Sequence, residues 1–113
     1  MPLDIGVLDD QYRYRRHLHI DRMIHGVLFK KLVTTESYPS LGRAHDDSED
    51  ITFTPDEIPA LRGDVARLTR RLMEDDIMSA EVKGRCIEFA AALDEICELA
   101  LEEGRNVEFI AGE

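Results

Sequence analysis

Apolar and polar residues alternate along the first twenty positions of the chain. Leu3, Ile5 and Val7 share one face of a strand that the pattern predicts over residues 3–8. Beyond a polar turn, the alternation continues over residues 12–20, which favours a second, half-buried strand and therefore a β-hairpin. The expected apolar side of the second strand consists of Tyr12, Tyr14, Leu18 and Ile20, with Arg16 as an exception, and the polar side consists of Arg13, Arg15, His17 and His19. A helix that begins near Tyr12 is the alternative, but the apolar positions there scatter around a helical wheel.

The spacing of apolar residues becomes helical after the hairpin. Asp21 can cap a helix predicted over about residues 21–33. Its apolar positions are Met23, Ile24, Val27, Leu28 and Leu32. Residues 34–50 then form a long polar connection, broken by Tyr38-Pro39 and Gly42. Connections of this length are uncommon in compact domains and are often functional when they are ordered.

A second helix is predicted after a short strand at residues 51–53. Thr54 and Glu57 have the spacing of a capping box, in which each side chain bonds the other residue's backbone amide. Pro59 disfavours helical geometry at the residue before it, so a distorted first turn is expected. The apolar stripe of this helix consists of Leu61, Val65, Leu68 and Leu72.

The third helix is predicted from a cap at Ser79 to about Glu103, where Gly104 can form a left-handed C-cap. A closing strand is expected over residues 106–110. The whole chain, residues 1–113, is expected to be a single domain. The fold class is α+β: a small antiparallel sheet, made of the N-terminal hairpin and the C-terminal strand, packed by three helices.

Charge divides the chain into two unequal parts. The net charge of the chain is −10, whereas residues 1–43 alone carry +2 and residues 44–113 carry −12. This acidic excess disfavours binding to nucleic acid or to anionic membranes, and it favours a basic protein partner. Arginines interleaved with Tyr12 and Tyr14 on the hairpin suggest nucleic-acid binding, but pairing of these arginines with carboxylates on the helices is the preferred interpretation.

The sequence predicts a cytoplasmic protein. Its start lacks the basic and apolar regions of a secretory signal, and no apolar run approaches the ~20 residues that span a bilayer. Cys86 and Cys97 lie eleven residues apart on the predicted third helix. That spacing separates them by roughly 16 Å, too far for a disulfide, so two reduced thiols in the core are expected.

His17, His19, Asp21 and His25 are the candidate metal ligands. Imidazole and carboxylate groups suit zinc and similar ions. The His-x-His-x-Asp order resembles that of metallohydrolases of the metallo-β-lactamase type, whose folds are much larger. A metal-dependent hydrolase or metal-binding protein is therefore the alternative function, and a solvated polar strand face is the simpler interpretation.

The acidic segment before the second helix is the candidate partner-binding site. Its proposed contact residues are Tyr38, as an aromatic anchor, with Asp46, Asp47, Glu49 and Asp50. The segment lacks the register of an EF-hand loop, so a docking surface is preferred to a calcium site. A small acidic domain of this kind is typical of an inhibitor or of a bacterial-type immunity protein that neutralises a basic enzyme. Solubility alone is the competing explanation for the acidity.

Catalytic motifs are missing from the sequence. None of the serines lies in a Gly-x-Ser-x-Gly turn, and the glycines are isolated from one another. No cofactor and no catalytic residue are therefore predicted. A homodimer formed through an exposed strand edge is a further alternative.

Overall fold

A computed structural model describes residues 3–45 and 49–111. Its strands are β1 (Leu3–Leu8), β2 (Tyr14–Ile20), β3 (Ile51–Phe53) and β4 (Val107–Ala111). They form one antiparallel sheet in the order β2-β1-β4-β3, in which the hairpin and the C-terminal strand lie side by side. The predicted α+β class with a small antiparallel sheet is therefore confirmed.

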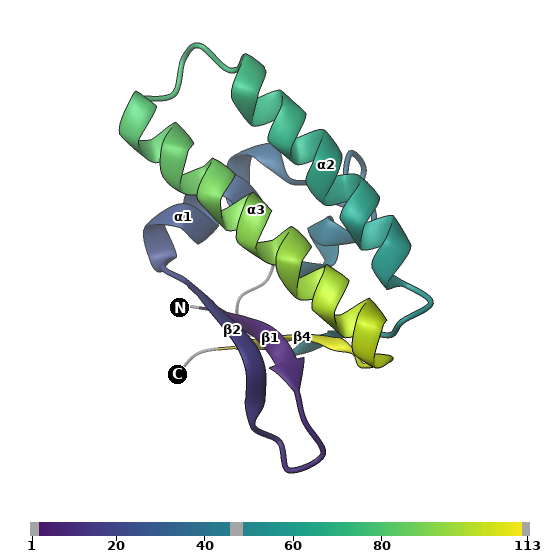
Figure 1. Cartoon of the computed structure of the whole chain (residues 1–113). Coiled ribbons are helices and arrows are strands. Elements are labelled where there is room, and N and C mark those ends of the chain that lie inside the picture. Colours follow the sequence, from purple (N-terminus) through teal and green to yellow (C-terminus); the bar gives the residue numbers. More distant parts are fainter. Residues whose placement is uncertain (1–2, 46–48, 112–113) are drawn as a thin grey trace.

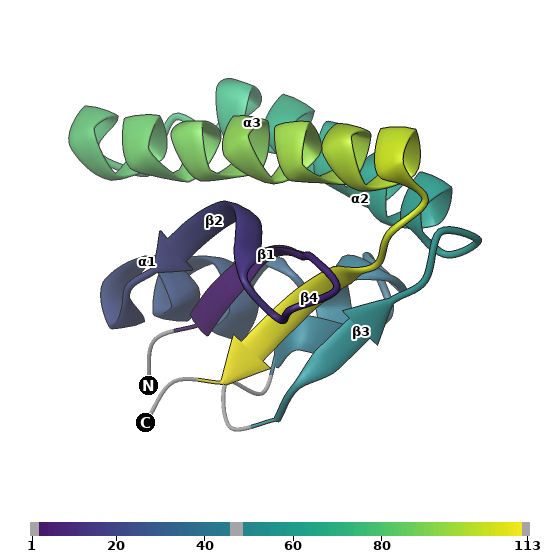
Figure 2. The same cartoon turned by 60° about the horizontal axis from the view of Figure 1, so that its bottom comes forward.

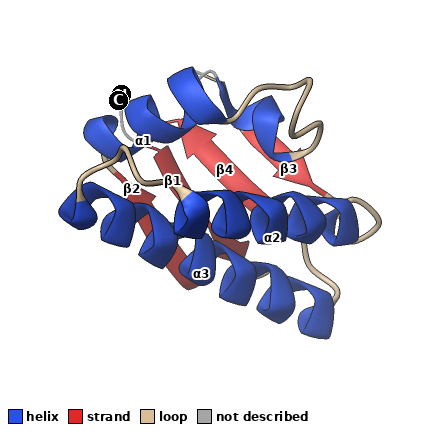
Figure 3. Cartoon of the chain, turned by 90° about the horizontal axis from the view of Figure 1, so that it is seen from above, coloured by secondary structure: helices blue, strands red, loops and turns tan. Residues whose placement is uncertain are grey.

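The helices cover one face of this sheet (Figures 1 and 2). Helix α1 (Arg22–Val27) continues directly into a π-helical turn, η1 (Leu28–Leu32), and a 3-10 helix, η2 (Leu41–His45), follows. The two long helices, α2 (Ile58–Glu74) and α3 (Ala80–Glu103), form a hairpin above the strands, with α1 and its following turns alongside (Figure 3). The core lies between these layers and includes buried Leu3, Ile5, Phe53 and Phe109 from the strands, with Leu61, Leu68 and Leu93 from the helices.

Local sequence signals set most helix boundaries. The Asp21 carboxylate accepts from the Ile24 amide at 2.9 Å and caps α1, and Ser79 caps α3 by accepting from Val82. Gly104 ends α3 in the left-handed conformation (φ 64°, ψ 35°), as predicted. The predicted helix over residues 21–33 is helical from residue 22 to residue 32, but its second half is wound as a π-helix.

The start of α2 shows half of the expected capping box. Glu57 accepts from the Thr54 amide at 3.0 Å, but the Thr54 hydroxyl donates to the same carboxylate instead of accepting from the helix. The regular helix begins only at Ile58, immediately before Pro59. The proline therefore distorts the first turn, as its disfavouring of helical geometry at the preceding residue predicts.

The hairpin contains a β-bulge that the alternation did not reveal. Val7 pairs with Arg16 and Leu8 pairs with Tyr14, which leaves Arg15 without an opposite residue. Tyr14 is thereby moved to the sheet face that has no helix on it, where its ring stacks on His17 with centroids 4.4 Å apart. The expectation that Tyr14 shares a face with Leu18 was wrong, because one extra residue reverses the alternation beyond it.

Part of the predicted polar connection belongs to the core. Tyr38, Leu41 and Ala44 are buried, and residues 41–45 are helical. Asp64 of α2, itself buried, accepts from the amides of Ser40 (2.8 Å) and Leu41 (3.0 Å) and so fixes the segment to the helix. The expectation of a wholly polar connection was wrong for this part, because Tyr38, Leu41 and Ala44, which recur every three residues, are buried together.

Both cysteines are buried and free, as predicted. Burial, and next the nearby Asp94 carboxylate, raise the pKa of the Cys97 thiol to about 12, and burial also raises the pKa of Cys86. At about pH 8, where an exposed thiol reacts readily, both groups stay protonated and shielded.

We expect Ellman's reagent to leave the native protein unlabelled and to react with both thiols as urea unfolds it. The midpoint of labelling should coincide with the midpoint followed by circular dichroism. Met73→Cys is the positive control, because Met73 is 62% exposed and a thiol there should react in the folded state. Labelling of the unmodified native protein as fast as this control would contradict the burial of the two cysteines.

Candidate functional site

The sheet face without helices carries a cluster of one aspartate and two histidines. Asp4 on β1 lies opposite His19 on β2. Its Oδ1 atom accepts from His17 Nε2 and from His19 Nδ1, each at 2.9 Å. The pKa of Asp4 is lowered, mainly by the hydrogen bond from His19 and also by that from His17. Partial burial of the carboxylate acts in the opposite direction and is outweighed. The carboxylate therefore orients both imidazoles, which remain about half exposed, at 44% and 52%.

Tyr14 closes the other side of this cluster. Its ring covers Gly6, and it stacks on His17. Burial raises the pKa of Tyr14, and the carboxylates of Asp4, Asp50 and Glu108 raise it further. The phenol is thus held protonated beside the two imidazoles.

The structure divides the predicted metal ligands among three places. His17 and His19 share the open sheet face, but Asp21 caps α1 and pairs with Arg85 at 2.5 Å. His25 is 1% exposed, with Nε2 3.2 Å from the Ala44 carbonyl oxygen. Among residues 3–45 and 49–111, no three His, Cys, Asp or Glu side chains are placed to hold a metal ion.

Asp4 is the member of this cluster that sequence reasoning missed. It lies on the polar side of the first predicted strand, and an antiparallel pairing of the two strands places it opposite His19. Pairing the residues of the two strands one by one from the turn would not place Asp4 opposite His19. The bulge at Arg15 shifts the register by one residue, so its position must be known first.

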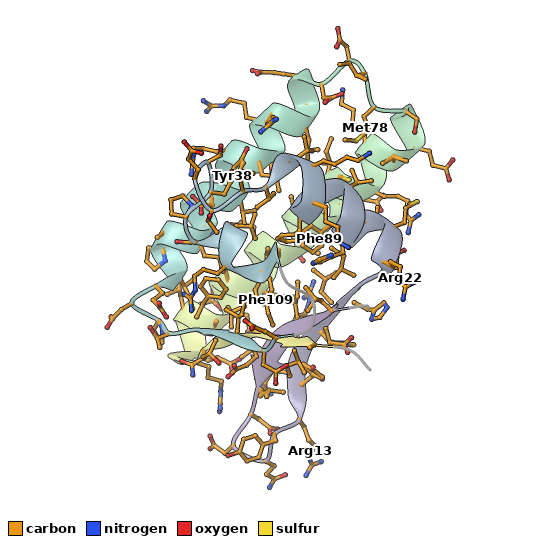
Figure 4. The ribbon with its side chains drawn as sticks, turned by 180° about the vertical axis from the view of Figure 1, so that it is seen from behind. Arg13, Arg22, Tyr38, Met78, Phe89 and Phe109 are labelled. Atoms are coloured by element: carbon orange, nitrogen blue, oxygen red, sulfur yellow. The ribbon has the colours of Figure 1, made fainter. Side chains whose placement is uncertain are left out.

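A pocket of about 290 Å³ lies between β2, α1 and α3. Its apolar lining residues are Leu18, Ile20, Ile24, Phe89 and Ala92. Its polar lining consists of His19, the Arg85–Asp21 ion pair and Glu88. Figure 4 shows Phe89 inside the fold, close to α1, and 5% of its surface is exposed.

Helix α3 concentrates the acidic charge of the protein. It carries seven acidic residues and two basic ones. Glu88, Glu95 and Glu102 recur every seven residues and so follow one outward line, and Glu98 lies beside them. Glu95 pairs with Arg16 at 2.5 Å. The other three carboxylates form no ion pair with any residue in the described part of the chain.

The predicted partner-binding residues do not form one exposed surface. Tyr38 is 4% exposed, with the Arg67 guanidinium 5.0 Å from its ring centroid, so the ring is part of the core (Figure 4). Glu49 and Asp50 are exposed, and Asp50 accepts from the Ala111 amide at 2.8 Å. Asp46 and Asp47 lie outside the described residues.

Two of the three hairpin arginines pair with carboxylates of α3. Arg15 pairs with Glu103 at 3.0 Å and Arg16 pairs with Glu95, as expected if these arginines bind helix carboxylates. Arg13 is hydrogen-bonded to Gln11 and forms no ion pair among the described residues.

No helix in the described part of the chain has the length and the apolar character needed to cross a membrane. Comparisons of the chain with models of protein families, with curated proteins and with solved structures find no match. The sheet face, the pocket and the acidic row on α3 are therefore the observations from which a function has to be inferred.

Proposed function

We propose that the protein is an interaction module, of the inhibitor or immunity type, that binds a basic protein partner through the exposed side of α3. The observation that carries this proposal is the row of Glu88, Glu98 and Glu102, none of which forms an ion pair among the described residues. Of the three, Glu98 has an arginine, Arg62, near enough to interact with it electrostatically. Complementary charge accelerates association and selects between partners, whereas ordinary surface acids are commonly interspersed with cations.

The geometry of α3 supports this role. The helix is held by seven buried side chains, among them Phe89, Leu93 and Ile96, so its outer side is a rigid surface. From Glu88 to Glu102 the row extends about 21 Å at the rise of an α-helix. That length is comparable with the width of a standard protein interface of about 800 Å² per partner.

Neutralising this row should abolish partner capture. We expect the variant with Glu88→Gln, Glu98→Gln and Glu102→Gln to fold normally, because glutamine and glutamate have similar helix propensities. The wild-type protein is immobilised and used to capture proteins from a lysate of the native cell at low salt. The triple variant should fail to capture these proteins, and added salt should release them from the wild-type protein.

The matched control removes the same charge elsewhere. Glu36→Gln, Glu74→Gln and Asp76→Asn change three exposed acids away from the outer row of α3. This control should capture the same proteins as wild type. Equal loss in both variants would mean that net charge alone acts, and equal capture by both would refute the role of α3.

A further inference from the structure

Strand β2 leaves one edge of the sheet open. It pairs with β1 on one side, and no strand lies on its other side in the described sheet. Alternate N–H and C=O groups of such a strand point outward and can pair with another extended chain. The strand has seven residues, all but Ile20 at least partly exposed. This edge is therefore accessible as a template for a further strand.

The pocket of about 290 Å³ is lined in part by this edge strand. Leu18 and Ile20 of β2 line it, and Ala92 lines it from α3. A strand added to β2 would lie about 4.8 Å farther out, and its side chains on the helix-facing side would line up with those of Leu18 and Ile20. One apolar side chain of that strand could therefore enter the pocket.

The charges around the pocket favour an added strand that has a cationic residue next to this apolar side chain. Arg85 is already paired with Asp21, and Arg16 with Glu95. Glu88 lines the pocket and pairs with no cation in the described part of the chain. Among the carboxylates and guanidinium that line the pocket, Glu88 is thus the one left uncompensated, so a lysine or arginine beside the apolar side chain would complement it.

A second copy of this chain fits the edge poorly. The apolar side chains of β2 already pack against the core of their own molecule: Ile20 is 2% exposed and Leu18 is partly buried. A second β2 strand therefore has no free apolar side chain that could enter the pocket. The edge is better suited to a different segment.

We propose that an extended segment of the basic partner adds to β2 as a fifth strand, with an apolar side chain in the pocket and a lysine or arginine beside Glu88. This inference rests on the proposed function for the charge of the partner, and it adds the mode of binding. Backbone hydrogen bonds would supply affinity, and the pocket and Glu88 would supply specificity.

The probe is a capped synthetic peptide, Thr-Lys-Thr-Leu-Thr-Lys-Thr, which carries Lys, Leu and Lys on one side of a strand in either direction. We expect it to shift the backbone amide resonances of β2, with smaller changes in β3, in an NMR titration up to about 1 mM peptide. Absence of binding, or shifts confined to β3, would overturn the proposal.

N-methylation separates strand addition from attraction by charge alone. Two versions of the peptide, methylated on one or the other alternate set of amides, keep the same charge and the same leucine. Because only alternate amides of an added strand bond the edge, one version should bind about tenfold more weakly or worse and the other should bind like the parent peptide. Equal binding of all three peptides would refute strand addition.

Filling the pocket tests the position of the apolar side chain. Ala92→Trp should occupy the pocket and weaken the parent peptide about tenfold. Ala91→Trp is the matched control, because Ala91 is the neighbouring residue on α3 and does not line this pocket. It should bind the peptide like wild type, and equal weakening by both substitutions would contradict the assigned site.

The two proposals can fail separately. Capture that depends on Glu98 and Glu102 but competes with no peptide would keep the acidic α3 surface and overturn strand addition. Peptide binding at β2 without any charge-dependent capture would do the reverse. Protection of β2 amides that disappears on dilution of the protein alone would show a second copy at the edge and would also overturn the proposal.

Discussion

Replacement of Asp64 by alanine is expected to lower the free energy of unfolding by about 3 kcal/mol. The Asp64 carboxylate accepts from the amides of Ser40 and Leu41 at 2.8 and 3.0 Å and is also bonded by Arg67. Because the Leu41 amide is buried, it would lose its partner without gaining full access to water, and each such loss costs about 1–3 kcal/mol. Urea denaturation measures the change, and hydrogen exchange should show the Ser40 and Leu41 amides unprotected.

Asp94→Ala is the matched control for this substitution. Asp94 also lies in a long helix and pairs with an arginine, Arg62, at 2.9 Å, but its side chain is 43% exposed. Surface pairs contribute less than about 1 kcal/mol, and both substitutions gain the same helix propensity. A loss of stability at Asp64 no larger than at Asp94 would show that the carboxylate does not hold the 3-10 segment on α2.

Gly6→Ala is expected to destabilise the protein by about 3 kcal/mol, as overpacking of a closely packed site does. A Cβ atom at this position would overlap the backbone carbonyl oxygen of Arg16 and would lie 2.5 Å from the Tyr14 ring. The ring can rotate away, but the carbonyl is fixed by the pairing of β1 with β2. The additional substitution Tyr14→Ala should therefore not restore stability, as measured by urea denaturation.

Gly63→Ala provides the opposite expectation. Nothing lies within 4 Å of a Cβ atom at Gly63, which sits in the middle of α2. Alanine there should raise stability by about 1 kcal/mol through its higher helix propensity. If Gly6→Ala did not lower the free energy of unfolding, the close contact between Gly6 and the Arg16 carbonyl oxygen would be contradicted.

Periodicity and caps were sufficient to predict the four strands and the two long helices of this fold. The stripe of α2, with Leu61 and Leu68, and the caps at Ser79 and Gly104 are local signals, and each is found where the sequence indicates. The π-helical turn after Val27 was not predictable in this way, since the helical spacing of apolar residues continues through it.

The candidate site was predictable only in part. His17 and His19 were expected on one polar face, and they are found there. Their partner is Asp4 on the neighbouring strand instead of Asp21, because contacts across a sheet depend on register, and a bulge changes register without a distinct sequence signal. Tyr38 could have been found, since Leu41 and Ala44 follow it at intervals of three residues and all three are buried, but three positions in a polar segment are a weak signal.

The acidic residues that lie together in the structure differ from those that are adjacent in the sequence. The sequence drew attention to the short run at residues 46–50, where the acids are adjacent. Helical spacing instead aligns Glu88, Glu95 and Glu102, which are far apart in sequence, along one side of α3. The hairpin arginines, which looked like a basic face, compensate two of the acids on that helix.

The position of β4 has a consequence for how the chain acquires its structure during synthesis. This strand lies between β1 and β3, so it joins the first strand to the third although it is the last to be translated. Until residues 107–111 leave the ribosome, β3 has no partner, and the hairpin exposes the edge that β4 will occupy. The sheet can therefore be completed only after β4 has left the ribosome, and until then the nascent chain carries an unpaired edge on the hairpin.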